Sequence, residues 1–390
     1  MKKISILGST GKIGEKAVEI AKLCHLNVVA ISGHNNYDKL LRQVNDNDLA
    51  PPPFVCVTTD EGYLKVRDIL AGRPNISVLP PSEIDNIARL EVDCCVMAIS
   101  GNAAVSPVFA SLGHAKRLAI ANKESIVSGG KLLIDTAIAS GTEIIPIDSE
   151  HNAIFQCLAG ENIEDVAEII LTASGGPFLD LEEESLGRVT VADALRHPKW
   201  DMGRKITVDS ATLINKALEI IEASYLFAPR SSQLPIKKIR SLLHPDSVIH
   251  GLVKFKDGVI KAAMSVQDMK LPISFAINYP ERQCHTNSTV DFEQIGKLTF
   301  KRPTMWQKRN IDLAYTAHNE KKVIALNVAN EIAVARFLSG QINFNEIYHL
   351  IVDIMNTANP ENITSKEDIF EAIRRVRAVF MEDARRFCLL

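Results

Sequence analysis

A glycine-rich turn near the start of the chain constrains its fold more than any other feature. Residues 4–7 are apolar, as in a buried strand, and residues 12–26 repeat apolar side chains at helical spacing. A second apolar run at 27–32 completes a strand–helix–strand unit, which implies a parallel sheet. The GxxGxxG pattern at 8–14 would let backbone N–H groups approach a pyrophosphate at the helix N-terminus. Such a turn also occurs without a ligand, so the pattern alone is a weak signal.

The alternation of strands and helices continues to about residue 148. Further apolar strands are predicted at 54–57, 94–99, 118–121 and 144–147, with a helix at 60–71. This order is typical of an α/β fold, and we expect a Rossmann-type, doubly wound parallel sheet over residues 1–148.

Two further domains are expected after residue 148. A strand at 169–173, an amphipathic helix at 211–227 and strand-like alternation over 247–278 predict a central α+β domain at 149–295. Asp257 and Gly258 interrupt that alternation and predict a hairpin turn. From 306 to 390 the pattern is helical and predicts a C-terminal helical domain.

Composition excludes several classes of protein. The net charge of −3 and the isoelectric point near 6.4 favour neither a nucleic-acid partner nor a membrane surface. Apolar runs stay well below the ~20 residues that span a bilayer, and the first residues enter a strand with no signal peptide ahead of it. Cys94 and Cys95 lie in an apolar run, so we expect them to be buried thiols. The odd count of seven cysteines and the lack of a CxxC pair fit a reducing, cytoplasmic compartment.

The end of the second strand indicates which nicotinamide cofactor would bind. NAD enzymes usually place Asp or Glu there for the ribose hydroxyls, whereas residues 32–36 contain no acid. Small polar groups and the imidazole of His34 would tolerate a 2′-phosphate, which favours NADP. The alternative is that Gly33 and Asn35 only form a turn.

A pair of carboxylates follows the last predicted strand of this domain. Asp148 and Glu150 are two residues apart, so on an extended segment both would face the same side. Two close carboxylates repel each other unless a cation or proton lies between them, and oxygen ligands favour Mg²⁺ or Mn²⁺. The alternative is a solvated acidic loop.

The helix predicted at 211–227 carries a polar stripe. Asn215 and Glu219 share a face at i and i+4, with Lys216 on its flank, and Asp209 or Ser210 is expected to cap the helix. The stripe is either a solvated face or a phosphate-and-metal site.

Two other segments leave alternatives open. Residues 197–203 have turn chemistry and carry Trp200 and Met202, so they predict either a mobile lid or a loop whose Trp fills the core. Lys123 and Glu124 follow a strand, where they could reach a ligand or form a surface ion pair.

Taken together, these segments resemble the 1-deoxy-D-xylulose 5-phosphate reductoisomerase family. The motifs follow one another in family order over nearly the whole chain, and the central ones are long and specific. They are ILGSTGKIG (6–14), ANKES (121–125), PIDSEHNAIFQCL (146–158), TASGGPF (172–178), HPKWDMGRKITVDSATLINKALE (197–219), HPDSVIHGLV (244–253) and ALNVANEIAVARFL (325–338).

The resemblance implies a role for each matching residue. NADPH would be bound by Thr10, Gly11, Lys12, Ile13, Gly33, His34, Asn35, Asn122, Glu124 and Gly203. A divalent cation, Mn²⁺ or Mg²⁺ with Co²⁺ as a further option, would be bound by Asp148, Glu150 and Glu219. The phosphorylated substrate would be bound by Lys123, Ser149, Glu150, Ser174, His197, Ser210, Asn215, Lys216 and Glu219. The catalytic residues among these would be Lys123, Asp148, Glu150, His197 and Glu219.

The resemblance also implies an activity and an assembly. The family converts 1-deoxy-D-xylulose 5-phosphate to 2-C-methyl-D-erythritol 4-phosphate by skeletal rearrangement and NADPH hydride transfer, in non-mevalonate isoprenoid precursor biosynthesis. Residues 197–205, with Trp200 and Met202, would form a closing flap, and the central domain would support a homodimer. His34 stands where the family commonly has Lys or Arg, and Met269 would lie near the nicotinamide.

Two other functions compete with this one. The first is an NADP-dependent dehydrogenase of the semialdehyde or homoserine type, which needs no metal site built from three carboxylates. The second is a non-catalytic NADP-binding regulator, which would bind cofactor without the polar stripe of residues 210–219.

Overall fold

The computed structural model describes residues 1–227, 234–283 and 289–387. It divides into two compact units: the first comprises Met1–Ser125, Leu133–Phe155 and Asp268–Thr289, and the second comprises Ile126–Leu132, Gln156–Gln267 and Val290–Leu390. Two of the seven cysteines, Cys284 and Cys388, lie outside the described residues.

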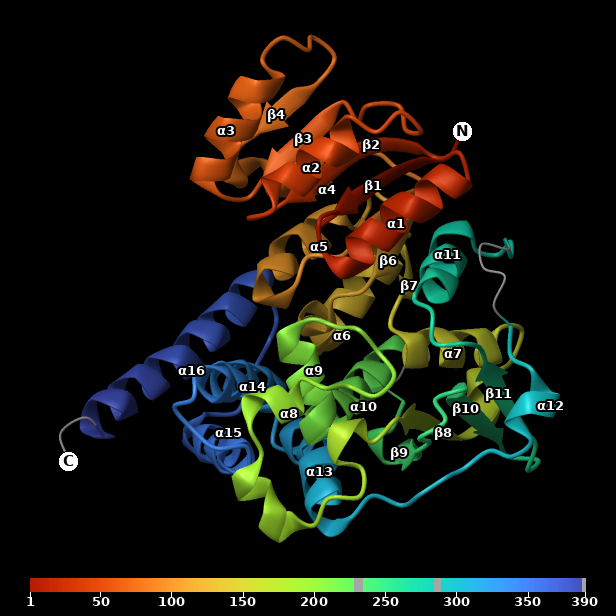
Figure 1. Cartoon of the computed structure of the whole chain (residues 1–390), viewed down its shortest axis with the longest axis vertical. Coiled ribbons are helices and arrows are strands. Elements are labelled where there is room, and N and C mark those ends of the chain that lie inside the picture. Colours follow the sequence, from red (N-terminus) through yellow and green to blue (C-terminus); the bar gives the residue numbers. More distant parts are fainter. Residues whose placement is uncertain (228–233, 284–288, 388–390) are drawn as a thin grey trace. The chain divides into compact units, whose positions relative to one another are not determined.

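The first unit contains a seven-stranded sheet in the order β4-β3-β2-β1-β5-β6-β7 (Figure 1). All six neighbouring pairs are parallel, which confirms the predicted Rossmann-type sheet. The strands are β1 (Lys3–Leu7), β2 (Asn27–Gly33), β3 (Phe54–Val57), β4 (Ser77–Leu79), β5 (Cys94–Met97), β6 (Arg117–Ile120) and β7 (Glu143–Pro146).

Helices connect these strands, as parallel pairing requires. They are α1 (Lys12–Leu23), α2 (Tyr37–Val44), α3 (Asp60–Leu70), α4 (Ile84–Ala88), α5 (Val105–Ser111), α6 (Lys123–Ser140) and α7 (Ser149–Leu158). The middle of α6 belongs to the second unit, and its φ/ψ angles break at Gly130.

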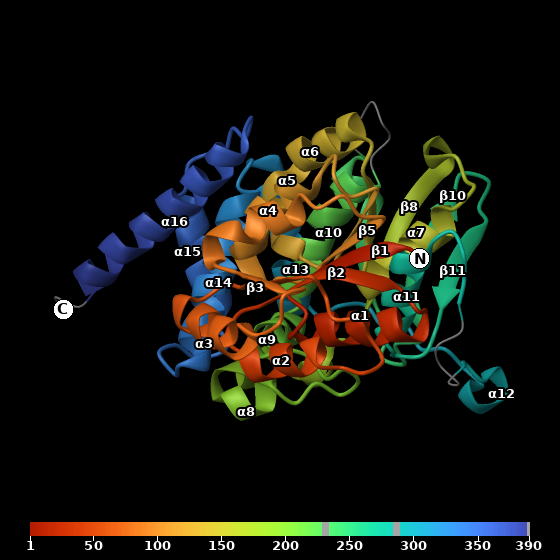
Figure 2. The ribbon, with the colours of Figure 1, turned by 90° about the horizontal axis from the view of Figure 1, so that it is seen from above.

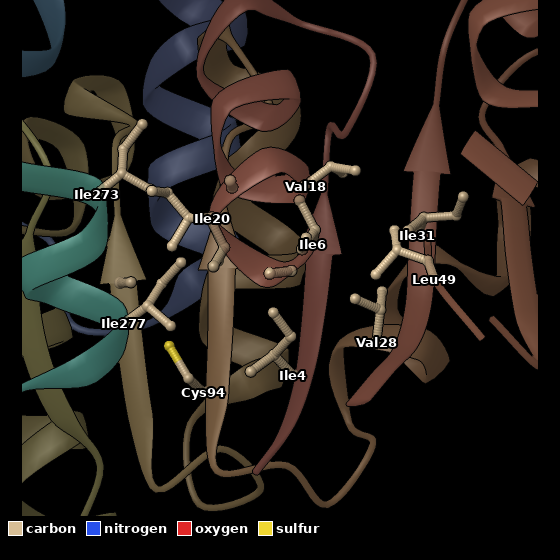
Figure 3. Packing of buried hydrophobic residues seen from close by; sticks show 14 of the residues in the cluster. Ile4, Ile6, Val18, Ile20, Val28, Ile31, Leu49, Cys94, Ile273 and Ile277 are labelled. Atoms are coloured by element: carbon tan, nitrogen blue, oxygen red, sulfur yellow. The ribbon is translucent and has the colours of Figure 1, made fainter. Parts of the chain in front are cut away.

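A segment from much later in the chain completes the core of the first unit. Helix α11 (Lys270–Asn278) occupies residues for which strand-like alternation had predicted a strand, so that prediction is wrong beyond Met264. Ile273 and Ile277 of α11 point into the same core as Ile20 and Cys94 (Figure 3). The side chains of Lys2 and Arg117 both donate to the carbonyl of Ile277, near the C-terminal end of α11. Positively charged side chains stabilise that end of a helix.

The second unit contains a four-stranded mixed sheet in the order β11-β10-β8-β9. Strands β8 and β9 are parallel, and the β8–β10 and β10–β11 pairs are antiparallel. Asp257 and Gly258 form the predicted turn between β10 and β11, with the Asp257 carboxylate accepting from the Val259 N–H at 2.9 Å. The strands are β8 (Val166–Ala173), β9 (Ile239–Leu243), β10 (Ile249–Phe255) and β11 (Ile260–Met264).

Helices make up the rest of the second unit, and α14, α15 and α16 pack together (Figure 2). These helices confirm the predicted helical pattern beyond residue 306. Among the described residues, none of the helices is long and apolar enough to cross a membrane. The helices are α8 (Val191–Ala194), α9 (Arg204–Thr212), α10 (Ile214–Leu226), α12 (Phe292–Ile295), α13 (Met305–Asn319), α14 (Val323–Leu338), α15 (Glu346–Thr357) and α16 (Lys366–Phe387).

The helix predicted at 211–227 begins later than expected. Leu213 has φ 62° and separates α9 from α10, so Ser210 lies inside α9 and α10 starts at Ile214. Neither Asp209 nor Ser210 caps α10, because Leu213 holds the N-cap position and provides no side-chain acceptor.

Candidate functional site

In the first unit, the predicted ligand residues lie at or just beyond the carboxyl ends of four strands. Because neighbouring strands are parallel, these ends meet at one edge of the sheet, where ligands bind in this fold. The predicted ligand residues are Thr10, Gly11, Lys12 and Ile13 after β1, Gly33, His34 and Asn35 at the end of β2, Asn122, Lys123 and Glu124 after β6, and Asp148, Ser149 and Glu150 after β7.

The turn after β1 needs glycine because α1 approaches it closely. A Cβ on Gly14 would lie 2.2 Å from the carbonyl oxygen of Gly8, and Gly8 itself has φ +87°. Gly11 is the N-cap residue of α1 and has no side chain to cover the helix end. A glycine turn that leads into a helix N-terminus in this way is typical of phosphate-binding turns.

The end of β2 presents an imidazole instead of an acid. His34 is exposed, and its Nδ1 lies 2.8 Å from the Thr58 hydroxyl. The Asn36 side chain accepts from the Lys39 N–H at 3.2 Å and caps α2. Part of this polar run therefore serves local structure, while the absence of a carboxylate still favours a 2′-phosphate.

The segment after β6 is held by an amide side chain. Asn122 caps α6 by accepting from the Ser125 N–H at 2.7 Å, and it donates to the carbonyls of Ile99 and Gly101, both at 3.0 Å. Glu124 accepts from the same amide at 2.9 Å. Because these contacts join the ends of β5 and β6, they fix the position of the backbone at Lys123, the first residue of α6.

Lys123 does not lie at the surface, so the alternative of a surface ion pair is wrong. Its side chain is buried, with the residue only 8% exposed, and it pairs with the carboxylate of Asp148. The buried ammonium of Lys123 is therefore directed at Asp148, the first predicted metal ligand. A substrate bound at that carboxylate would lie beside Lys123.

Asp148 and Glu150 do not share an extended segment, so that prediction is wrong. Glu150 lies in the first turn of α7, and Asp148 precedes it and accepts from the N–H groups of Glu150 at 3.1 Å and His151 at 3.3 Å. This N-cap geometry satisfies helix N–H groups that would otherwise lack partners. Ser149 donates to the Glu150 carboxylate at 2.6 Å. The helix start, not strand pleating, brings the two carboxylates together.

The charge of Asp148 is stabilised by its neighbours. Burial alone would raise the pKa of this carboxyl, but the Lys123 ammonium and the His151 imidazole hold it well below the ordinary value. The Nδ1 of His151 lies 3.2 Å from the Asp148 carboxylate. Sequence reasoning missed His151 as a partner; its position three residues after an N-cap aspartate is the signal that could have found it. An ionised, oriented carboxylate is suited to binding a divalent cation.

In the second unit, a histidine joins two serines that come from different elements. The Nε2 of His197 lies 3.2 Å from the Ser174 hydroxyl and 3.1 Å from the Ser210 hydroxyl. Ser174 follows β8, and a Cβ on the adjacent Gly176 would lie 2.9 Å from the Ser210 carbonyl oxygen. Glycine at 176 therefore allows α9 to approach the end of β8, which brings the three side chains together.

The polar stripe on α10 is buried, so the solvated-face alternative is wrong. Lys216 and Glu219 are 2% and 0% exposed, and their charged atoms lie 2.5 Å apart. The Asn215 amide also donates to the Glu219 carboxylate. A cation, an amide and a carboxylate held out of water are suited to a phosphate or a metal, because charge interactions strengthen when water is excluded.

Residues 197–203 of the predicted flap lie in loop structure before α9, and its last two residues, 204 and 205, begin that helix. Trp200 is half-buried, and its ring centroid lies 6.1 Å from that of His250, so it does not fill the core. Gly203 is the N-cap residue of α9 and accepts from the Thr207 N–H at 3.0 Å. Its predicted contact with NADPH stays a prediction, because it belongs to the second unit while the other predicted cofactor residues belong to the first.

Three family models match the chain. They are 1-deoxy-D-xylulose 5-phosphate reductoisomerase at residues 4–130, its C-terminal domain at 144–227, and the DXP reductoisomerase C-terminal domain at 264–379. A 1-deoxy-D-xylulose 5-phosphate reductoisomerase of Geotalea daltonii is 41% identical over 95% of this chain and 96% of its own length. That of Thermus thermophilus is 40% identical over 99% of this chain and 100% of its own.

Solved structures agree with these relatives. The reductoisomerase from Zymomonas mobilis in complex with NADPH is 32% identical, with a TM-score of 0.88, over 97% of both chains. A DOX-P reductoisomerase in complex with NADPH, fosmidomycin and magnesium is 34% identical, with a TM-score of 0.87, over 97% of both chains. The resemblance drawn from the sequence motifs is confirmed: the chain belongs to the 1-deoxy-D-xylulose 5-phosphate reductoisomerase family.

Proposed function

We propose that this chain converts 1-deoxy-D-xylulose 5-phosphate to 2-C-methyl-D-erythritol 4-phosphate with NADPH, in non-mevalonate isoprenoid precursor biosynthesis. The observation that carries the proposal is family membership over nearly the whole chain, at 41% identity to one relative over 95% of its residues. The comparisons support this function and not a semialdehyde or homoserine dehydrogenase.

The first unit supplies the residues for NADPH. The pyrophosphate would be bound by the N–H groups of residues 10–13 at the start of α1, and Gly33, His34 and Asn35 would lie by the adenosine ribose phosphate. Asn122, Glu124 and Gly203 would contact the cofactor. The glycine-dependent turn and the absence of an acid at the end of β2 support these assignments.

The cation would be bound by Asp148, Glu150 and Glu219, as the family resemblance implies. The donors fit Mg²⁺ or Mn²⁺, since hard cations prefer carboxylate oxygens, and the neighbours of Asp148 keep that group ionised. When bound, such a cation supplies Lewis-acid polarisation of a substrate carbonyl.

The remaining side chains would bind and orient the substrate. Lys216, Asn215 and the His197–Ser174–Ser210 cluster offer donors for the phosphate. Lys123 and Ser149 lie beside the first two carboxylates and would contact the substrate's oxygens. Closure of the flap at 197–205 would exclude water from a reactive aldehyde intermediate before hydride transfer.

The assembly and domain organisation are also proposals. A homodimer is supported by β11, an edge strand whose first residue Ile260 is 52% exposed and is preceded by Val259, which is 54% exposed. Light scattering on the purified protein should then give twice the mass of one chain. The division at 1–148, 149–295 and 306–390 is supported in its first boundary by family-model matches at 4–130 and 144–227, while the third match, at 264–379, begins within the proposed second domain. A cytoplasmic location is supported by the free cysteines among the described residues.

The decisive experiment is an assay of NADPH oxidation with 1-deoxy-D-xylulose 5-phosphate. Turnover should require Mg²⁺ or Mn²⁺ and stop with a chelator, and calorimetry should show metal-dependent binding of fosmidomycin. A simple dehydrogenase would keep its activity without metal, and a regulator would bind NADPH without turnover. Absence of metal-dependent fosmidomycin binding would refute the proposal.

A further inference from the structure

The backbone breaks at Leu213, between the two helices that carry the proposed substrate groups Ser210, Asn215 and Lys216. Leu213 has φ 62° and ψ 12°, in the left-handed region that residues other than glycine rarely adopt. Its side chain is enclosed, since the residue is 2% exposed. A conformation of this kind persists only where the surrounding structure holds it. The contacts that hold the break therefore set the position of Ser210 relative to Asn215 and Lys216.

Two buried amides from the C-terminal helices reach α9 on either side of Ser210. Asn330 of α14 donates its side-chain N–H to the carboxylate of Asp209 at 2.8 Å. Asn310 of α13 donates to the backbone carbonyl of Thr212, also at 2.8 Å. The two asparagines are 0% and 5% exposed. They lie 121 and 98 residues after their acceptors in the chain, so both contacts form only when the C-terminal helices have packed.

The contact of Asn310 replaces a hydrogen bond that the break removes. In an unbroken helix the N–H of Lys216 would donate to the carbonyl of Thr212, four residues earlier. Because the chain turns at Leu213, that N–H donates to the Leu213 carbonyl instead, at 3.1 Å. A buried carbonyl without a partner is destabilising, and the Asn310 amide supplies the missing donor. The amide therefore stabilises the broken conformation relative to a continuous helix.

The contact of Asn330 fixes the rotation of α9 about its own axis. Asp209 is 2% exposed and directly precedes Ser210, so the direction of its side chain determines the direction in which Ser210 projects. The same carboxylate pairs with Lys205, one turn earlier, at 2.9 Å. That pair lies within α9 and cannot orient the helix by itself, whereas Asn330 belongs to α14 and can.

The acceptor ends of these amides show that packing of the C-terminal helices does not explain them. Among the residues that the structure describes, Oδ1 of Asn310 and Oδ1 of Asn330 are buried and have no hydrogen-bond partner. An unpaired buried acceptor lowers stability, and a leucine of similar size would avoid that loss. The donors, both directed at α9, are the feature that favours asparagine at 310 and 330.

We propose that Asn310 and Asn330 are positioning residues, which hold α9 at the break so that Ser210 faces the same substrate phosphate as Asn215 and Lys216. This inference rests on the proposed function, which places the phosphate at those three side chains. Neither amide is among the proposed ligands, so each acts through α9. Loss of either contact should weaken binding of the substrate and leave binding of NADPH unchanged, because the proposed pyrophosphate turn belongs to the first unit.

The experiment measures steady-state kinetics of the full chain with NADPH and Mg²⁺, with 1-deoxy-D-xylulose 5-phosphate as the varied substrate. Asn310→Leu removes one donor, and Asn330→Asp places two carboxylates against each other. Both should raise the substrate KM about tenfold or more while the KM for NADPH stays within about twofold. A purely structural role would instead lower Tm and the amount of active protein, which changes the apparent kcat and not KM.

A swap of the second pair tests whether the hydrogen bond itself is responsible. Asp209→Asn combined with Asn330→Asp restores one donor and one acceptor with the same total charge. The double variant should return the substrate KM to within about threefold of the wild-type value. Because KM does not depend on the fraction of the protein that folds, a less stable variant still tests the inference.

Tyr315→Phe is the matched control, because Tyr315 also lies on α13 and donates to a backbone carbonyl, that of Ile239, at 2.8 Å. It should lower Tm with no change in either KM. Wild-type substrate KM values in Asn310→Leu and Asn330→Asp, or no recovery in the swapped pair, would overturn the inference. If the wild type itself shows no turnover, the proposed function fails and this inference fails with it, which distinguishes the two cases.

Discussion

The two units form their proposed ligand sites by different means. In the first unit the proposed pyrophosphate site follows a strand end, and its chemistry comes from backbone groups at a turn that only glycine fits at Gly8 and Gly14. In the second unit the chemistry of the proposed site comes from side chains on and before α9 and α10, with Lys216 and Glu219 buried and paired. A backbone site depends on local conformation, whereas a buried side-chain site depends on packing against elements distant in the sequence.

The energetic consequences also differ. A substitution in the glycine turn introduces a steric clash with backbone that cannot move out of the way. Removal of one partner of a buried ion pair instead leaves a charge without water or counter-ion, which costs about 3–5 kcal/mol. Substitutions in the glycine turn and on α10 should therefore separate cofactor binding from metal and substrate binding.

The largest effect is expected for Glu219→Gln. The variant loses a proposed metal ligand and leaves Lys216 without its anionic partner. We expect kcat/KM to fall about a thousandfold or more and Mn²⁺ binding measured by calorimetry to be lost. NADPH affinity, which depends on the first unit, should change little.

Glu168→Gln is the control for this substitution. Glu168 pairs with Arg240 at 2.6 Å in the same unit, but both side chains are partly exposed, and such pairs contribute about 0–1 kcal/mol. The control should retain wild-type activity. Equal losses in both variants would show that activity is sensitive to any missing carboxylate in this unit, and the metal assignment of Glu219 would fail.

The next effect concerns the first unit. In Gly14→Ala the added methyl would lie 2.2 Å from the Gly8 carbonyl oxygen, so α1 must move away from the turn. We expect the KM for NADPH to rise about tenfold or more, while metal-dependent fosmidomycin binding without cofactor is retained. Gly72→Ala is the control, because a Cβ there meets nothing within 4 Å. Unchanged NADPH binding in Gly14→Ala would contradict the backbone-site interpretation.

The smallest effect tests packing in the second unit away from the site. Glu361 accepts from the N–H groups of Ile324 and Ala325 at the start of α14, at 3.0 and 2.8 Å. Burial raises the pKa of this carboxyl from 4.5 to about 7 even though these N–H groups act to lower it. The folded state therefore binds the proton more tightly than the unfolded state, and Glu361 lowers stability as pH rises from 4.5 to about 7.

Glu361→Gln removes this titration and keeps an acceptor oxygen. Relative to wild type, its Tm should be similar near pH 5 and higher by a few degrees near pH 8, as measured by thermal unfolding. Glu346→Gln is the control: Glu346 accepts from the Asn343 N–H at 2.6 Å at an exposed helix start. A Tm difference between variant and wild type that does not grow with pH would refute the prediction.

The local patterns predicted most strands of the first unit, because strand–helix alternation and the glycine turn are properties of neighbouring residues. They missed β4, which is only three residues long, and they missed the helices α2, α4, α5, α6 and α7. They also predicted a strand where α11 forms. The apolar residues of α11 contact a core formed almost entirely by residues far earlier in the chain, and local spacing does not show such contacts. The family resemblance identified the candidate site residues as a set, but it did not predict which of them contact one another.

Residues close together in the chain were enough to establish the α/β class, the glycine turn, the absence of an acid at the end of β2 and the hairpin at Asp257 and Gly258. Three other features emerged only from the folded chain: Asp148 caps α7, Leu213 divides α9 from α10, and Lys216 and Glu219 are buried. Burial and pairing arise from elements that meet after folding. Side-chain spacing along one helix or strand therefore does not show which face of that element will be buried.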